Sequence, residues 1–271
     1  MTNNILNHAA LLSLYDRQMR VEQIIPDARR EVVRAPGGGT VVRYVRPAPA
    51  KIFINYAHLQ EEEVDAAIQQ QIADLRPLGQ PFEWIVYDHD GPPNLSERLQ
   101  AHGFRCDGPS TILALDFAEA ARAAYAPLLD PVRVDVRPTS SREGLEDVIR
   151  VMEKVYGANF NWMRGRMGGH LDVPGYLSIY TAYVNDEPAC AGWIYYYPNS
   201  DFAGLWGGST VERYRGQGLY TAVLAARVQE ALRRGVRCLF LDASDMSRPI
   251  VSKYGFHLLD MECSYEWEEE P

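Results

Sequence analysis

Apolar residues recur at helical spacing between positions 219 and 232 of the chain. Those that fall on one face of the predicted helix are Leu219, Ala222, Val223, Ala226, Val228 and Leu232. The preceding stretch, residues 202–211, is apolar and punctuated by glycines, which predicts a strand. The turn between them reads Arg213-Tyr214-Arg215-Gly216-Gln217-Gly218. The pattern therefore predicts a strand, a glycine-containing turn and a helix in succession.

This turn has the chemistry of an anion-binding site. Gly216 and Gly218 let backbone N–H groups approach a ligand closely, and the helix N-terminus adds a favourable partial charge. Arg213 and Arg215 add two full positive charges. A pyrophosphate would fit here. The alternative is that the glycines only cap a surface helix of a domain without activity.

Two other kinds of phosphate-binding loop fail on the sequence. A dinucleotide-binding fingerprint requires Gly or Ala at position 221, which is Thr221. A P-loop requires Gly-Lys-Ser or Gly-Lys-Thr after four intervening residues, and the sequence contains neither tripeptide. Binding of a nucleoside triphosphate is therefore not expected.

A second strand and a short helix follow the first helix. Residues 238–242 form an apolar run, and residues 247–256 end in Lys253-Tyr254-Gly255-Phe256. The turn, with Arg213, Gly216 and Gly218, resembles motif A of the GNAT acyltransferase superfamily, whose pattern is Gln or Arg, two residues, Gly, one residue, then Gly or Ala. The segment ending at Phe256 resembles motif B of the same superfamily. The order and spacing of the two motifs make the resemblance specific.

The chain divides into two halves that look like copies of one fold. A proline-containing segment, residues 125–131, separates them, and the alternation in residues 132–137 starts a new first strand. Tyr254-Gly255-Phe256 has a counterpart in His102-Gly103-Phe104, 152 residues earlier. We expect an N-terminal domain over residues 1–126 and a C-terminal domain over residues 132–271.

The same offset places the turn of the C-terminal half on Glu61-Glu62-Glu63-Val64-Asp65-Ala66. This segment has no glycine, and its carboxylates favour a helix N-terminus that satisfies itself and repels a pyrophosphate. We infer that the N-terminal domain does not bind coenzyme A in the usual manner. The resemblance thus implies a tandem GNAT protein with one degenerate half.

The order of elements predicts an α/β (α+β) fold. Two GNAT-like domains are expected, each with a mixed, mostly antiparallel sheet flanked by helices. In the C-terminal half we predict a helix from about Arg142, an irregular segment over 157–175, and a hairpin of strands 177–184 and 189–197.

Composition limits the partners. The chain has 271 residues, a formal net charge of -9 and a pI of about 5.2, so a basic nucleic-acid footprint is not expected. The four cysteines, Cys106, Cys190, Cys238 and Cys263, form no Cys-x-x-Cys pair. We expect reduced core thiols and no metal site. With no apolar run of membrane-spanning length, we expect a cytoplasmic protein that is a monomer or homodimer.

The resemblance implies acetyl-CoA or a related acyl-CoA as cofactor. Its pyrophosphate would dock on the N–H groups of residues 215–221, and its pantetheine arm would pair like a strand with residues 208–210. The expected cofactor-binding residues are Gly208, Ser209, Thr210, Arg213, Arg215, Gly216, Gln217, Gly218, Leu219, Tyr220 and Thr221.

The catalytic residues depart from the family pattern. The Tyr that often protonates the departing thiolate stands four residues before Gly-Phe, where this chain has Val251. Tyr254 and Tyr220 are the candidate substitutes, and packing is the alternative role for both. Some members carry a carboxylate on the fourth strand, where this chain has Gly204. Candidate bases are therefore Glu212, His170, Asp201 and Asp242, or a water chain.

Three functions remain open. The first is an N-acetyltransferase that moves an acetyl group from acetyl-CoA to a primary amine of a small molecule or peptide by direct attack. The second is a non-catalytic acyl-CoA-binding or sensing protein. The third is a structural module whose degenerate half mediates self-association.

Overall fold

The computed structural model describes residues 2–139 and 141–268, and the side chains of residues 2–7 are outside that description. The chain forms two compact units. The N-terminal unit holds the described residues up to 112 and those from 258 onward, and the C-terminal unit holds those from 113 to 257. The domain limits expected from the sequence, 1–126 and 132–271, describe two similar halves of the sequence and remain a prediction. The two units differ from these halves because they exchange their last strands.

The N-terminal unit begins with helices and continues into its strands. Its elements are α1 (Thr2–Tyr15), the π-helix η1 (Asp16–Val21), β1 (Arg29–Arg34), β2 (Thr40–Val45), β3 (Ile52–His58), the 3-10 helix η2 (Glu61–Glu63), α2 (Val64–Leu75), η3 (Arg76–Leu78), β4 (Phe82–Tyr87), α3 (Leu95–Ala101), β5 (Phe104–Cys106) and, from the end of the chain, β12 (His257–Trp267).

From β7 onward, the C-terminal unit has the order of strands and helices predicted for its half, and β6, α4 and η4 precede them. Its elements are β6 (Ser110–Asp116, from residue 113), α4 (Arg122–Tyr125), η4 (Ala126–Leu129), β7 (Val136–Thr139), α5 (Leu145–Tyr156), α6 (Trp162–Leu171), β8 (Leu177–Val184), β9 (Glu187–Tyr196), β10 (Phe202–Thr210), η5 (Glu212–Tyr214), α7 (Leu219–Arg233), β11 (Cys238–Ala243) and α8 (Arg248–Ser252).

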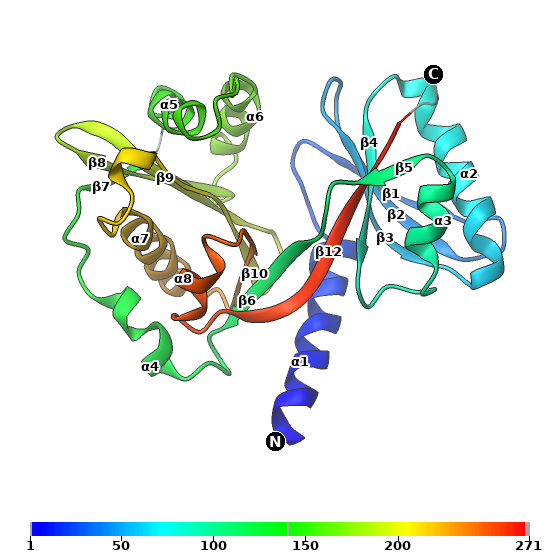
Figure 1. The fold of residues 1–271 in the computed structure, drawn as a ribbon, viewed down its shortest axis with the longest axis horizontal. Helices are drawn as coiled ribbons and strands as arrows, with labels where there is room; N and C mark the ends of the chain where they lie inside the picture. Colours follow the sequence, from blue (N-terminus) through cyan, green and yellow to red (C-terminus); the bar gives the residue numbers. More distant parts are fainter. Residues whose placement is uncertain (1, 140, 269–271) are drawn as a thin grey trace. The chain divides into compact units, whose positions relative to one another are not determined.

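Each unit has a mixed, mostly antiparallel sheet, as expected. In the N-terminal unit the strand order is β1-β2-β3-β4-β12, with β5 beside β12, and only β3 and β4 are parallel. In the C-terminal unit the order is β6-β11-β10-β9-β8-β7, with a parallel pair at β10 and β11. In Figure 1, α5 and α6 lie over one face of the C-terminal sheet and α7 lies over the other.

Amphipathic patterning places these helices. The faces of α2 and α3 that carry Val64, Ile68 and Leu99 pack on the N-terminal sheet around Trp84, which is 1% exposed. Of the predicted apolar face of α7, Val228 and Leu232 pack with β10 and β11, and Leu219 and Val223 pack in a separate cluster with β8 and β9. The segment between Gly157 and Gly175, predicted as irregular, contains α6.

Strand β12 completes the core of the N-terminal unit although it comes from the end of the chain. Its residues 262–266 pair with β4, and residues 265–267 pair with β5. This pairing brings Cys263 to Cys106, and the two form a disulfide. The expectation of reduced thiols is therefore wrong for this pair, whose partners are 157 residues apart in sequence. Cys190 and Cys238 are free and buried, as expected.

Because Tyr265 on β12 is 6% exposed and belongs to the core around Trp84, its loss should open a cavity. We expect Tyr265→Ala to lower the free energy of unfolding of the N-terminal unit by about 3 kcal/mol. Leu258→Ala is the matched control, since Leu258 begins the same strand and is 45% exposed. Denaturant unfolding followed by hydrogen exchange of β3 and β4 measures the effect. Equal stability of the two variants would contradict this role of β12.

Candidate functional site

The parallel strands β10 and β11 separate after a short paired stretch. Their register runs only from Phe202 opposite Cys238 to Gly204 opposite Phe240. Strand β10 nevertheless continues to Thr210, and β11 continues to Ala243. Beyond Gly204, the edge of β10 that faces β11 therefore no longer pairs with it. An extended ligand can add to such an edge by main-chain hydrogen bonds.

A β-bulge shapes the same edge. The register of β10 against β9 shifts between Trp206 and Ser209. Gly207 has a φ of 64°, and a Cβ added there would lie 1.9 Å from Cζ3 of Trp193, so only glycine fits. The bulge therefore re-aims the backbone of residues 207–209, which includes two of the predicted cofactor-binding residues.

The predicted anion-binding turn lies directly after β10. It consists of η5, residues 215–218, and the first turn of α7. Gly216 and Gly218 have φ values of 75° and 77°, and a Cβ on either would meet no atom within 4 Å. The first N–H groups of α7 have no intrahelical partner, as at any helix N-terminus. The turn fits a pyrophosphate.

The two arginines of the turn differ in their surroundings. Arg213 forms an ion pair with Glu187, which also accepts hydrogen bonds from Lys154 at 2.7 Å and from the Tyr214 hydroxyl at 2.6 Å. These partners, Lys154 first, lower the pKa of Glu187 to about 2. Arg215 donates from Nε to the carbonyl oxygen of Thr210 at 3.4 Å. The charge of Arg213 is thus partly neutralised, whereas Arg215 is directed toward the end of β10.

Of the two candidate proton donors, the structure brings Tyr220 to the bulge. A Cβ on Gly208 would lie 2.8 Å from Cε2 of Tyr220. Burial raises the pKa of Tyr220, and the charge of Arg227 and a hydrogen bond with the Ser247 side chain oppose this rise. Tyr254, like Tyr220, packs against the core that includes Val251.

The candidate bases are scattered over the C-terminal unit. Glu212 is exposed in η5, and Asp242 is exposed on β11. His170 on α6 is 2% exposed, and its Nδ1 lies 2.9 Å from the Tyr195 hydroxyl. At position 204 a Cβ would lie 2.6 Å from Nε1 of Trp206, which explains why a carboxylate side chain does not fit there.

Sequence reasoning missed Arg227, which lies on α7 behind the bulge. It is 2% exposed, and its Nη1 donates to the carbonyl oxygens of Trp193 at 3.3 Å and Trp206 at 3.2 Å. Burial lowers the pKa of this guanidinium. The signal in the sequence is a charged residue four positions after Val223, on the apolar face of the helix.

Comparisons with known proteins agree with this geometry. Residues 147–256 match the model of the acetyltransferase (GNAT) family. This segment belongs to the GNAT family. No curated protein matches the sequence.

Solved structures show the same fold over nearly the whole chain. A GCN5-related N-acetyltransferase from Kribbella flavida is similar with a TM-score of 0.69 and 14% identity, over 97% of this chain and 96% of that one. A tandem GNAT protein from the clavulanic acid biosynthesis pathway, solved without AcCoA, gives a TM-score of 0.60 and 15% identity, over 92% of this chain and 86% of that one. A functionally unknown conserved protein from Staphylococcus epidermidis gives 0.61 and 14%, over 96% and 100%.

In the N-terminal unit, the parallel strands β3 and β4 also separate after a short paired stretch, as β10 and β11 do in the GNAT segment. Its parallel pair runs from Ile52 opposite Phe82 to Ile54 opposite Trp84, and β3 then continues to His58. Here the side chain of Arg20 reaches the edge that the GNAT segment leaves open. Nε of Arg20 donates to the carbonyl oxygen of Asn55 at 3.0 Å, and its Cζ lies 4.0 Å from the centroid of the Tyr87 ring.

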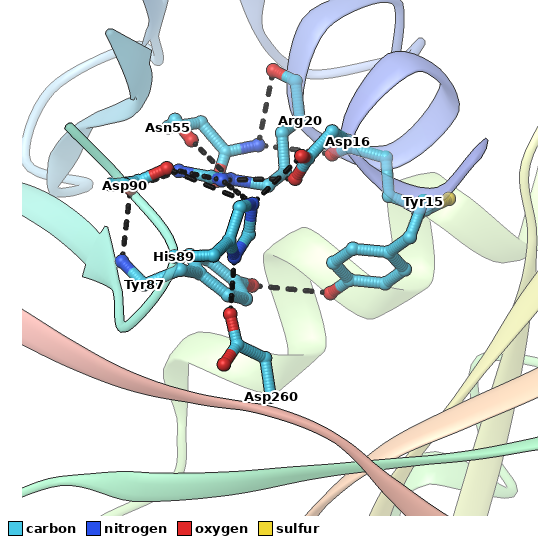
Figure 2. Close-up of polar contacts among 9 residues, drawn as sticks. Tyr15, Asp16, Arg20, Asn55, Tyr87, His89, Asp90 and Asp260 are labelled. Carbon is cyan, nitrogen blue, oxygen red and sulfur yellow. Dashed lines mark hydrogen bonds and ion pairs between the residues drawn. The ribbon is translucent and has the colours of Figure 1, made fainter. Parts of the chain in front are cut away.

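Carboxylates hold Arg20 in this place (Figure 2). Its two Nη atoms donate to the Asp90 carboxylate at 2.8 Å and 2.6 Å, and Nη1 also donates to Asp16 at 2.9 Å. Burial alone would lower the pKa of Arg20, but its bonds with Asp90 raise it. An extended ligand could add to β3 at Asn55 only by displacing this buried ion pair.

The helix that follows β3 satisfies its own N-terminus. Glu63 accepts a hydrogen bond from the Gln60 backbone N–H at 2.9 Å, and the Gln60 side chain completes a capping box. An adjacent cavity of about 470 Å³ is lined by side chains that include Asp16, Glu61 and Asp90. The lining also holds His58 and His89, and Asp16 and Asp90 are paired with Arg20, so Glu61 supplies the negative charge that is unfavourable for a phosphate.

His89 closes this cluster. Its Nε2 lies 2.8 Å from Asp16, and its Nδ1 contacts Asp260. Burial alone would lower the pKa of His89, but its bonds with Asp16 and Asp260 raise it to about 9. The folded N-terminal unit therefore holds an imidazolium between two carboxylates near neutral pH.

This raised pKa predicts a dependence of stability on pH. The contribution of His89 is complete below its ordinary pKa of about 6.5 and is lost as the pH rises toward 9, because the folded state then releases its extra proton. We expect the melting temperature to fall over this window and His89→Gln to flatten that fall. His257→Gln, at an exposed histidine, is the control. The same pH dependence in His89→Gln and wild type would contradict this assignment.

Proposed function

We propose that the protein is an N-acetyltransferase that moves an acetyl group from acetyl-CoA to a primary amine of a small molecule or peptide. The observation that supports this most directly is the unpaired edge of β10 leading into the open helix N-terminus of α7. Together they offer a strand-like partner for a pantetheine arm and a cradle of N–H groups for a pyrophosphate.

Each part of the proposed site has a defined task. The edge of residues 208–210 pairs with the pantetheine arm, and the N–H groups of residues 215–221 bind the pyrophosphate. Arg215 adds positive charge between the end of β10 and the glycine-containing turn. The enzyme thereby holds the thioester beside the acceptor, so that attack by the amine is effectively intramolecular.

Proton transfer falls to Tyr220 in this proposal. The amine nitrogen bonds to the carbonyl carbon, the carbon–sulfur bond breaks, and its electron pair goes to sulfur. Tyr220 lies against Gly208 and donates a proton toward that sulfur. Because position 204 has no room for a carboxylate, the amine loses its proton to water or to one of the candidate bases, such as Glu212 or His170.

A second candidate function is a non-catalytic acyl-CoA-binding or sensing protein. It is favoured by Val251, which is fully buried where the family often has its acid, and by the absence of a carboxylate at position 204. This reading requires cofactor binding without release of thiol in the presence of any amine.

We also propose the cytoplasm as the location, because coenzyme A thioesters are available there. In the described residues, no helix has the length and apolarity needed to cross a membrane.

Gly216→Glu tests the pyrophosphate site. The added carboxylate should weaken coenzyme A binding by on the order of tenfold or more, equivalent to about 1.4 kcal/mol. A thermal-shift titration with acetyl-CoA, coenzyme A and NAD measures binding, because a ligand of the native state raises its stability. Wild type should respond to the first two ligands and not to NAD.

Two controls separate charge from backbone strain. Gly216→Asn keeps a residue that tolerates the left-handed conformation and adds no charge. Gly79→Glu adds the same side chain at a glycine with φ 64° in the N-terminal unit. Both should retain binding. Unchanged affinity in Gly216→Glu would reject the pyrophosphate assignment.

Tyr220→Phe tests the proton donor. We expect kcat to fall by about a hundredfold with coenzyme A affinity retained, because only the hydroxyl is removed. Tyr254→Phe is the matched comparison, because Tyr254 packs against the same core as Tyr220 but lies after α8 rather than on α7. Thiol release with a panel of primary amines measures turnover. If Tyr254→Phe loses activity and Tyr220→Phe does not, Tyr254 is the proton donor and Tyr220 is a packing residue.

A further inference from the structure

Arg227 is a buried cation whose partners are backbone carbonyl groups. Besides Trp193 and Trp206, it donates from Nε to the carbonyl oxygen of Val223 at 3.2 Å. Within residues 2–139 and 141–268, it forms no ion pair with a carboxylate. Glu230, one turn further along α7, is instead engaged by Ser178 at 3.0 Å, Tyr180 at 2.7 Å and Arg234 at 2.7 Å.

The titratable groups around Arg227 do not neutralise it. Those that act on its pKa are Tyr220 on α7, Cys190 and Tyr196 on β9, and Tyr180 on β8. Burial raises the pKa of the Cys190 thiol to about 11, and burial also raises the pKa values of the three tyrosines. All four groups are therefore neutral near pH 7, and the positive charge remains uncompensated.

The guanidinium lies against the part of β10 that the proposed function uses. A Cβ on Gly208 would lie 3.6 Å from Nη2 of Arg227, and a Cβ on Gly192 would lie 3.0 Å from its Cζ. Two glycines thus let the guanidinium approach the sheet closely. Its contacts with Trp193 and Trp206 join β9 to β10 at the start of the bulge.

The other fully buried arginine of this chain has the opposite environment. Arg20 is 1% exposed and meets the carboxylates of Asp90 and Asp16. It reaches the edge of β3 that is equivalent to the unpaired edge of β10. At the closed edge of β3, carboxylates neutralise the buried charge of Arg20. Near the open edge of β10, the buried charge of Arg227 has no carboxylate partner among the described residues.

We infer that Arg227 is a positioning residue of the transferase reaction, which fixes the β10 bulge and favours departure of the coenzyme A sulfur as a thiolate. The inference rests on the proposed function. As the carbon–nitrogen bond forms and the carbon–sulfur bond breaks, the electron pair moves to sulfur, and a fixed positive charge behind Gly208 stabilises that negative charge. This stabilisation acts before Tyr220 protonates the sulfur, in a chain that has Val251 where the family often has its acid.

The pKa of the thiol of enzyme-bound coenzyme A tests this role. It is read from the ultraviolet absorbance of the thiolate during a pH titration, with the desulfo-coenzyme A complex as the blank. In wild type the bound thiol should have a pKa lower than that of free coenzyme A by on the order of one unit. In Arg227→Met this shift should disappear, and kcat should fall about tenfold, with a smaller change in KM for acetyl-CoA.

Two further variants separate charge from packing. Arg227→Lys keeps a cation without the planar fork and should retain most of the thiol shift. Arg233→Met removes an exposed charge from the same helix and should leave the shift unchanged. Arg227→Met relieves the desolvation of a buried charge but also removes a donor from the carbonyl groups of Trp193 and Trp206, so its melting temperature is measured beside that of wild type.

The outcomes distinguish this inference from the proposed function. Failure of wild type to bind coenzyme A would reject the function itself. Coenzyme A bound with an unshifted thiol pKa, or with the same shift in Arg227→Met, would overturn the role of Arg227 and leave the function standing. If Arg227→Met does not fold, the comparison of wild type with free coenzyme A, and with Arg227→Lys, still decides the question.

Discussion

The parting of two parallel strands governs both units of this protein. Three residue pairs join β10 to β11, and three join β3 to β4, before the strands separate. Backbone N–H and C=O groups left without a partner are costly when buried, so each unpaired edge needs a ligand, water or a side chain. The residues around each unpaired edge differ according to whether a ligand or a side chain is its partner. At β10 the bulge, the two-glycine turn and the open N-terminus of α7 keep the edge accessible. At β3 a π-helix delivers Arg20 to Asn55.

Closure of the β3 edge by Arg20 depends on further contacts. A guanidinium buried at a strand edge is stable only with its charge balanced, and Asp90 and Asp16 supply that balance. Asp16 is in turn shared with His89, whose other nitrogen meets Asp260 near the end of the chain. The closed edge therefore couples η1, β3, the residues after β4 and the start of β12 into one network. The capping box of Gln60 and Glu63 removes the remaining need for an anion at α2. The strands of this unit separate like those of the proposed acyl-CoA site, but the Arg20 ion pairs and the capping box occupy the places that a ligand would need.

Local patterns predicted much of this architecture. The strand, turn and helix around Gly216 were evident from apolar spacing and glycine positions, and so was the hairpin of β8 and β9, because these signals are local in sequence. The repeat of Gly-Phe at an offset of 152 residues revealed two similar halves. The exchange of last strands, the pairing of Cys106 with Cys263, and the ion pair of Arg20 with Asp90 were not predictable in this way. Each depends on which distant segments pair in the folded state, and no local spacing encodes that choice.

Arg227 shows how a violation of the helical pattern carries information. A cation on the apolar face of α7 lowers the stability that the same helix would have with an apolar residue, because its hydration is lost and no carboxylate replaces it. Arg20 demonstrates that this chain can neutralise a buried guanidinium completely where it lies beside a closed strand edge. Arg227 instead lies on α7 and contacts backbone carbonyl groups of β9 and β10. Residues that break the rules of packing tend to persist where function needs them. A permanent charge behind the bulge stabilises the departing sulfur before Tyr220 protonates it, so the two residues together take the place of the acid that Val251 does not provide.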